Sequence, residues 1–117
     1  MPQVIIALGS NCHQSAHIQW AAQRLARCLD DLRFSRRLWT ADIHGSGAQY
    51  MNCLAIGVTF LNAERLQQEL KAIESETGRT PGRVTIDLDL MLYDDLRYHE
   101  RDWPRPYIQQ LITDIQP

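Results

Sequence analysis

The sequence predicts one α+β domain over residues 1–117, with the ferredoxin-like order β-α-β-β-α-β, an antiparallel sheet, helices on one face and a short C-terminal helix. Three observations predict this fold. Short, β-rich apolar runs alternate with two stretches of helical periodicity. The Gly and Pro clusters at 45–47 and 78–82 are typical of loops inside a domain. A chain of 117 residues can also bury one core, but not two.

The first half of the chain is expected to form a strand, a helix and a second strand. Residues 4–8 are a continuous apolar run that ends at the polar turn 9–11, which is typical of a buried strand. Residues 32–40 predict one further strand, followed by a polar loop over 42–49. Between the two strands, an apolar stripe with helical spacing predicts a helix through Ile18, Ala22, Leu25 and Leu29.

The second half is expected to repeat the pattern. Residues 50–61 alternate large and small side chains, which predicts a strand whose small face can admit a helix. Asn62 is a favourable N-cap and Gly78 a favourable C′ residue for the helix between them. Residues 84–93 predict the last strand. After this strand, the spacing of Ile108, Leu111, Ile112 and Ile115 predicts a short amphipathic helix.

Composition narrows the functional class. A net charge of −2 and a pI near 6.0 give no general attraction to nucleic acid or anionic membranes. The longest apolar run is too short to cross a bilayer and no basic flank of a signal peptide is present, so we expect a soluble, cytoplasmic protein. The three cysteines lack metal-binding spacing and predict buried, reduced thiols. The four histidines form no ligand pattern and are expected at the surface.

The sharpest chemical feature is the pair Asp87 and Asp89 within an otherwise apolar strand. Side chains alternate along a strand, so both carboxylates lie on one face while Ile86, Leu88, Leu90 and Leu92 fill the other. Two neighbouring carboxylates resist ionisation unless a cation lies between them, which favours a Mg²⁺ site. The alternative is a solvated strand face that carries two aspartates, and the spacing alone does not decide between them.

Other residues point in the same direction without being specific. Arg79 and Arg83 flank a Pro-Gly turn just before the acidic strand and can bind polyphosphate, or form an ordinary basic loop. Glu74 lies near the end of the second predicted helix, facing either the sheet edge or solvent. Tyr50 and Asn52 share a strand face and offer a ring and an amide to a heteroaromatic ligand, although a core tyrosine and a turn asparagine explain them equally well.

Together these residues resemble the 6-hydroxymethyl-7,8-dihydropterin pyrophosphokinase family. The resemblance rests on the opening strand with its turn, the start of the strand at 50–52, and segments 74–79 and 85–93. It implies a pyrophosphokinase-like domain over 1–117, a ferredoxin-like α+β fold, and transfer of pyrophosphate from ATP to the hydroxymethyl group of the dihydropterin. AMP is the second product, and the pathway is folate biosynthesis.

The resemblance also implies roles for individual residues. Two Mg²⁺ ions are implied at Asp87 and Asp89, with Arg83 as a third catalytic residue. The implied pterin-binding residues are Thr40, Ile43, Tyr50 and Asn52. The implied ATP-binding residues are Lys71, Glu74, Arg79, Leu90 and Arg101. The expected partners are these small molecules, without nucleic acid or membrane, and the expected state is a monomer or weak homo-oligomer.

The chain departs from the family at two places. The loop before the acidic strand is shortened to 79–84, and the segment after Pro106 lacks the arginine and aromatic that the family carries. Arg105 stands where the family has a histidine, and either Tyr107 or Trp103 is a candidate for the missing ring. A shortened paralogue that binds pterin or nucleotide without turnover therefore stays an alternative. A ferredoxin-like regulatory or RNA-binding module is a third possibility, but it leaves the paired aspartates unexplained.

Overall fold

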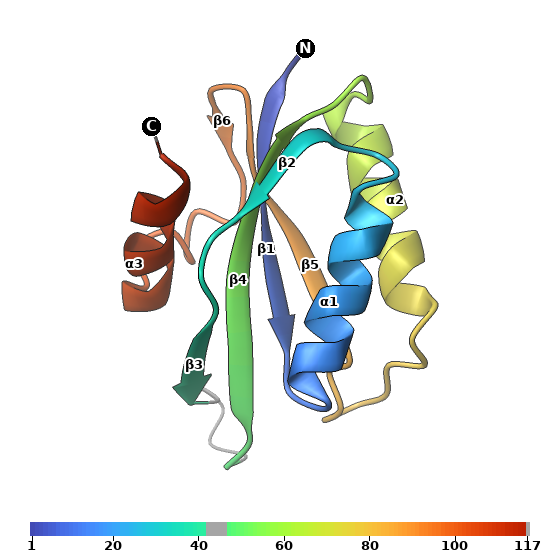
Figure 1. Cartoon of the computed structure of the whole chain (residues 1–117), viewed down its shortest axis with the longest axis vertical. Helices are drawn as coiled ribbons and strands as arrows, with labels where there is room; N and C mark the ends of the chain where they lie inside the picture. The colour runs from blue at the N-terminus through green and yellow to red at the C-terminus, as the bar shows by residue number, and fades with distance from the viewer. Residues whose placement is uncertain (42–46, 117) are drawn as a thin grey trace.

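The computed structural model describes residues 1–41 and 47–116 (Figure 1). The elements follow in the order β1 (Gln3–Ser10), α1 (Gln14–Leu25), β2 (Asp30–Phe34), β3 (Leu38–Ala41), β4 (Gln49–Val58), α2 (Ala63–Ser75), β5 (Asp87–Tyr93), β6 (Leu96–Arg97) and α3 (Pro106–Ile115). The predicted α+β order is confirmed, with the second strand divided into β2 and β3 and the short strand β6 added. No helix in the described ranges is long and apolar enough to span a membrane.

The strands form an antiparallel sheet in the order β2-β4-β1-β5-β6, and β3 also pairs with β4. β1 is central and pairs with β4 on one side and with β5 on the other. Residues at the end of β1 are therefore flanked by both neighbouring strands, although those strands are far apart in the sequence.

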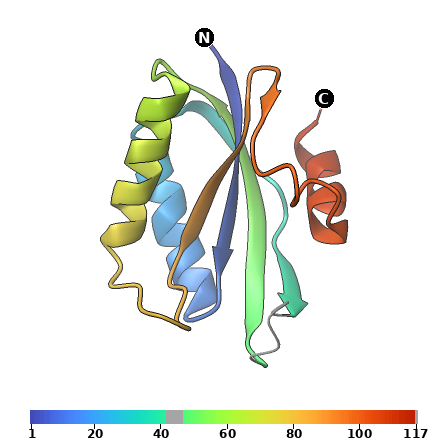
Figure 2. The same cartoon turned by 180° about the vertical axis from the view of Figure 1, so that it is seen from behind.

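Helices lie on both faces of the sheet (Figures 1 and 2). α1 and α2 cover one face, where Ile18 and Leu66 pack with the β1 residues Val4, Ile6 and Leu8. α3 packs on the opposite face against a smaller cluster that includes Ile5, Leu54, Ile56 and Met91. The four apolar residues predicted for α3 are all buried there. Because this helix is short, it covers only part of its face.

As predicted, α1 packs on the face of β4 that carries small side chains. Cys53 and Ala55 belong to the core under the two long helices. Gly57 continues this face, and a Cβ added there would lie 2.9 Å from the carbonyl oxygen of Asp30. A larger residue at 57 would therefore push β2 away from β4.

The first predicted helix and the strand after it differ from expectation. α1 ends at Leu25 and buries Ala21 rather than Ala22, while Leu29 is buried beyond the helix, where the chain turns into β2. Amides 28 and 29 both donate to the Leu25 carbonyl and close the helix there. The predicted strand 32–40 is interrupted at 35–37. The Ser35 N–H still donates to the Leu54 carbonyl at 2.8 Å, but the Leu54 N–H donates to the Ser35 hydroxyl at 2.8 Å instead of to a backbone carbonyl.

Three further expectations are corrected at the ends of elements. β4 stops at Val58, and Phe60, placed on the strand by the sequence, is 83% exposed beyond it. β5 begins at Asp87 rather than at 84. Leu92 does not share a face with Leu88 and Leu90, because an irregularity in the pairing of β1 with β5 leaves Met91 without a partner and turns the strand over.

The three cysteines are free thiols, as predicted, but only Cys53 is buried. Burial raises the pKa of the thiols of Cys28 and Cys53, which keeps both protonated.

Candidate active site

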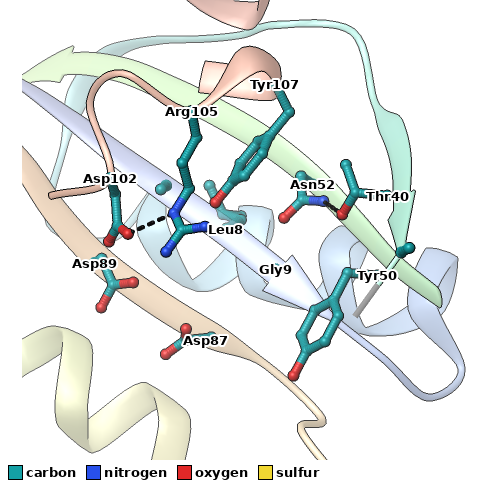
Figure 3. A pocket seen from close by; sticks show the side chains of 12 residues that line it. Leu8, Gly9, Thr40, Tyr50, Asn52, Asp87, Asp89, Asp102, Arg105 and Tyr107 are labelled. Carbon is teal, nitrogen blue, oxygen red and sulfur yellow. Dashed lines mark hydrogen bonds and ion pairs between the residues drawn. The ribbon is translucent and has the colours of Figure 1, made fainter. Parts of the chain in front are cut away.

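A cavity of about 190 Å³ lies on the α3 face of the sheet, in the part that the helix leaves open (Figure 3). Its lining brings together five of the predicted site residues: Thr40, Tyr50, Asn52, Asp87 and Asp89. Three further lining residues come from the start of α3 and the turn before it: Asp102, Arg105 and Tyr107. The predicted acidic pair and the predicted ring and amide therefore share one cavity.

The strand register explains why these residues meet. Gly9 of β1 pairs with Asn52 of β4 on one side and with Asp87 of β5 on the other. Ala7, two residues earlier on the same face, pairs with Asp89. A Cβ added at Gly9 would lie 3.4 Å from Asn52 Oδ1, so the absence of a side chain at Gly9 leaves space at the base of the cavity. The small residues of β1 thus separate an acidic wall on β5 from an amide wall on β4.

The acidic pair is electrostatically strained. Burial raises the pKa of Asp89 to about 6, and the neighbouring charge of Asp87 adds to the rise. His99, expected to be a surface histidine without a ligand role, lies with Nε2 at 3.8 Å from Asp89 Oδ1, and its positive charge when protonated lowers that pKa. Positive charge between the carboxylates would relieve their repulsion.

The donor set fits a hard divalent cation. Among the described residues, no three or more His, Cys, Asp or Glu side chains converge into a metal-binding group. Mg²⁺ commonly takes only one or two carboxylates from the protein and completes its octahedron with water and substrate phosphates. Asp87 and Asp89, which are 40% and 32% exposed at their side chains, offer such an open pair.

The other half of the cavity is suited to a flat, polar ligand. Asn52 is buried, and its Nδ2 donates to Thr40 Oγ1 at 2.7 Å, which fixes the orientation of the amide. The rings of Tyr50 and Tyr107 both line the cavity beside this amide (Figure 3). Burial raises the pKa of Tyr107, so its hydroxyl stays protonated. Ile43, the fourth predicted pterin-binding residue, lies outside the described residues.

A second, more open cavity of about 660 Å³ lies beside the end of α2. It brings together three of the predicted ATP-binding residues, Lys71, Glu74 and Arg79, with the loop up to Val84. Glu74 accepts the Leu88 N–H at 2.7 Å and so attaches α2 to the outer edge of β5. Burial raises the pKa of Glu74 to about 7, and Asp87 adds to this rise while the bond from Leu88 and the charge of Arg79 oppose it.

Three predicted residues are not among those that line either cavity. Leu90 is 2% exposed, with its side chain in the core under α1 and α2. Arg83 is exposed at the end of a tight turn in which it exchanges backbone hydrogen bonds with Thr80, and Gly82 has φ of 77° there. Arg101 is exposed in the turn before α3. The predicted roles of Arg83, Leu90 and Arg101 therefore stay predictions.

Sequence reasoning did not assign a role to Asp102, which lines the cavity and holds Arg105 Nε at 2.8 Å. The i, i+3 spacing of Asp102 and Arg105 just before a helix is the sequence feature that could have predicted this ion pair. Of the two candidate rings, Trp103 is buried with its Nε1 bonded to the Tyr98 carbonyl, whereas Tyr107 lines the cavity. The sequence could not distinguish Tyr107 from Trp103, because it does not show which side of the turn before α3 faces the sheet.

The fold and the cavity define an α+β domain with an acidic pair opposite an amide and two rings. The family model described as 7,8-dihydro-6-hydroxymethylpterin-pyrophosphokinase (HPPK) matches residues 5–117, and the chain belongs to this family. The predicted resemblance is thereby confirmed.

Curated relatives are folate synthesis bifunctional proteins. The one from Chlamydia muridarum is 29% identical over 136 residues, covering 97% of this chain and 30% of the relative. The one from Arabidopsis thaliana is 30% identical over 129 residues, covering 97% of this chain and 27% of the relative. The chain therefore spans less than a third of the length of these relatives. Both alignments are longer than the 117 residues of the chain, so the relatives carry segments here that this chain lacks.

Proposed function

We propose that this domain transfers pyrophosphate from ATP to the hydroxymethyl group of 6-hydroxymethyl-7,8-dihydropterin, as a cytoplasmic enzyme of folate biosynthesis. The observation that carries the proposal is the shared cavity, in which Asp87 and Asp89 face Asn52 and Tyr50 across the floor formed by Gly9. Family membership supports the same reaction.

The reaction needs alignment and charge neutralisation rather than a protein nucleophile. The pterin hydroxyl oxygen bonds to the β-phosphorus of ATP and loses its proton to water, while the bond from that phosphorus to the α,β-bridging oxygen breaks and AMP leaves with this oxygen. Asp87 and Asp89 would hold Mg²⁺, which when bound neutralises phosphate charge. Among the described residues that line the cavity there is no Ser/His or Cys/His pair, which agrees with direct transfer.

Asn52 and the two tyrosines are proposed to orient the pterin. Among the described residues, one amide hydrogen of Asn52 is bonded to Thr40, and its carbonyl oxygen and second amide hydrogen are proposed to bind the edge of the heterocycle. Tyr50 and Tyr107 supply flat surfaces for stacking, and Tyr107 takes the place of the ring that the family carries in its longer C-terminal segment. Held in this way, the hydroxymethyl group faces the acidic pair.

The open cavity at the end of α2 is proposed to take the nucleotide. Lys71, Glu74 and Arg79 line it, and Asp87 lies directly beside Arg79 at its border with the pterin cavity. Arg105, fixed by Asp102, adds a second guanidinium beside the acids. Leu90 would contribute through its backbone groups, since its side chain is buried in the core, and Arg101 would contribute from the exposed turn before α3.

The direct test measures AMP release by the purified protein with ATP, Mg²⁺ and the dihydropterin. We expect AMP only when all three are present, and none from Asp89→Ala. Titration with a non-hydrolysable ATP analogue and with pterin, each with and without Mg²⁺, then separates binding from turnover. Absence of AMP under saturating substrates would rule out the enzymatic function.

The shortened chain favours one alternative, a catalytically impaired paralogue that binds pterin or nucleotide. Its specific support is that residues 76–86 form the whole connection between α2 and β5, and that the alignments with the relatives are longer than this chain. This alternative predicts that pterin raises the melting temperature without any AMP being formed.

A further inference from the structure

Arg79 stands at the border between the two cavities. Its Nη1 lies 3.4 Å from Asp87 Oδ1 and 3.7 Å from Glu74 Oε2. Arg79 lines the cavity at the end of α2, whereas Asp87 lines the cavity under α3. One guanidinium therefore joins the acidic pair of one cavity to the wall of the other.

The position of this guanidinium is set by its surroundings. Glu74 is held by the Leu88 N–H at 2.7 Å, so one of the two acidic partners is fixed to β5. Gly78 has φ of 69° and turns the chain after α2, which brings Arg79 back toward the strand. The Arg79 side chain is still 41% exposed, so it can leave Asp87 at small cost.

We propose that Arg79 is an exchanging counter-ion. It neutralises Asp87 while no divalent cation is bound, and it turns to the phosphate oxygens of the nucleotide once a cation occupies Asp87. The proposal rests on the proposed function, because it takes the acidic pair as the metal-binding group. Two positive groups repel each other at a single carboxylate, so the guanidinium and the metal compete for Asp87. The fork of donors on arginine matches phosphate oxygens, which gives the displaced side chain a second partner.

Competition of this kind predicts effects of opposite sign from one substitution. Arg79→Gln removes the competitor, so the affinity for metal alone rises by about two- to fivefold, the worth of an exposed ion pair. The same substitution removes a charge-assisted contact to phosphate, so the affinity for the metal–nucleotide complex falls by about tenfold or more. A residue that only stabilises the loop would not raise metal affinity.

The experiment titrates Mn²⁺ into wild type and Arg79→Gln, by calorimetry or by the electron paramagnetic resonance of free Mn²⁺, with and without a non-hydrolysable ATP analogue. Arg65→Gln is the matched control, because Arg65 is also exposed and paired with an acid of α2, at 2.9 Å from Glu69. We expect Arg79→Gln alone to give tighter Mn²⁺ binding without nucleotide and weaker binding of Mn²⁺ with nucleotide. Arg79→Lys, which keeps the charge but not the fork, is expected to leave the affinity for Mn²⁺ alone near that of wild type.

Unchanged or weaker binding of Mn²⁺ alone by Arg79→Gln would overturn the exchange, and so would a failure of wild type to bind Mn²⁺. The proposed function is judged separately, by AMP release from the wild type. If the wild type releases AMP but the affinities do not shift in opposite directions, only the exchange fails. If they do shift while no AMP forms, the exchange stands in a domain that binds without turnover.

Discussion

Asn11 and Val84 are hydrogen-bonded in both directions: the Asn11 N–H donates to the Val84 carbonyl at 2.9 Å, and Asn11 Oδ1 accepts the Val84 N–H at 2.7 Å. Asn11 Nδ2 also donates to the Gly82 carbonyl at 3.3 Å. The turn after β1 thus holds the end of the short loop that carries Arg79 and lines the open cavity.

Replacing Asn11 with Ala is expected to loosen this loop. The Val84 and Gly82 backbone groups lose their side-chain partners, at a cost of about 1–2 kcal/mol in the free energy of unfolding. We expect faster amide hydrogen exchange over residues 80–84 and an increased KM for ATP. Asn62→Ala is the control, because Asn62 also accepts a backbone N–H, from Arg65 at 2.8 Å, but caps α2 at its far end. An equal increase in KM for both variants would contradict a specific role for Asn11.

Removing one carboxylate of the acidic pair is expected to abolish transfer. Asp89→Asn keeps the shape of the side chain but removes its negative charge, so the rate of AMP release should fall by at least about 100-fold. Because burial and Asp87 both disfavour ionised Asp89, this variant should fold at least as stably as wild type when no metal is present. Asp95→Asn, in the exposed turn between β5 and β6, serves as the control and should keep full activity.

Tyr107 is expected to act through its ring. Tyr107→Ala removes one stacking surface and should raise the KM for the pterin about two- to tenfold, with a smaller effect on the KM for ATP. Tyr107→Phe keeps the ring and should remain close to wild type. Phe60→Ala removes an aromatic side chain that is 83% exposed outside the cavity and should change neither KM. A normal pterin KM in Tyr107→Ala would show that this ring does not contact the substrate.

Stability is expected to depend on pH through Glu74 and Asp89. The native pKa values, about 7 and about 6, lie above the ordinary values of 4.5 and 3.8, so the folded state keeps protons that the unfolded chain has lost. Without metal, the free energy of unfolding should therefore be greatest below about pH 4 for these two groups, and should fall as pH rises to about 7.

Glu74→Gln isolates one of these groups, because its amide oxygen can still accept the Leu88 N–H. Urea unfolding at pH 5 and pH 8 should show a smaller decrease than in wild type, with a gain on the order of 1 kcal/mol at pH 8. Glu64→Gln changes an exposed glutamate in the first turn of the same helix and is the control. An unchanged pH dependence in Glu74→Gln would mean that this carboxyl does not titrate with folding.

The order of elements was predictable because residues that are buried recur along the sequence with the period of the helix or strand that buries them. The continuous apolar run of β1, the small face of β4 and the stripe of α3 each occupy the core as their spacing predicts. Two of the errors lie where a single polar side chain or an irregular pairing interrupts the pattern. Ser35 divides one predicted strand, and the irregularity at Met91 turns Leu92 to the other face.

By itself, the sequence determined the fold class, the family and the placement of Asp87 and Asp89 on one strand face, because alternation along a strand is a local property. Tertiary structure decided which residues those carboxylates meet. Register with β1 sets Asn52 opposite them, the turn before α3 selects Tyr107 over Trp103, and the fold beyond Gly78 places Arg79 against Asp87. Such contacts join residues distant in sequence, and they depend on strand pairing and chain reversal, which no local pattern records.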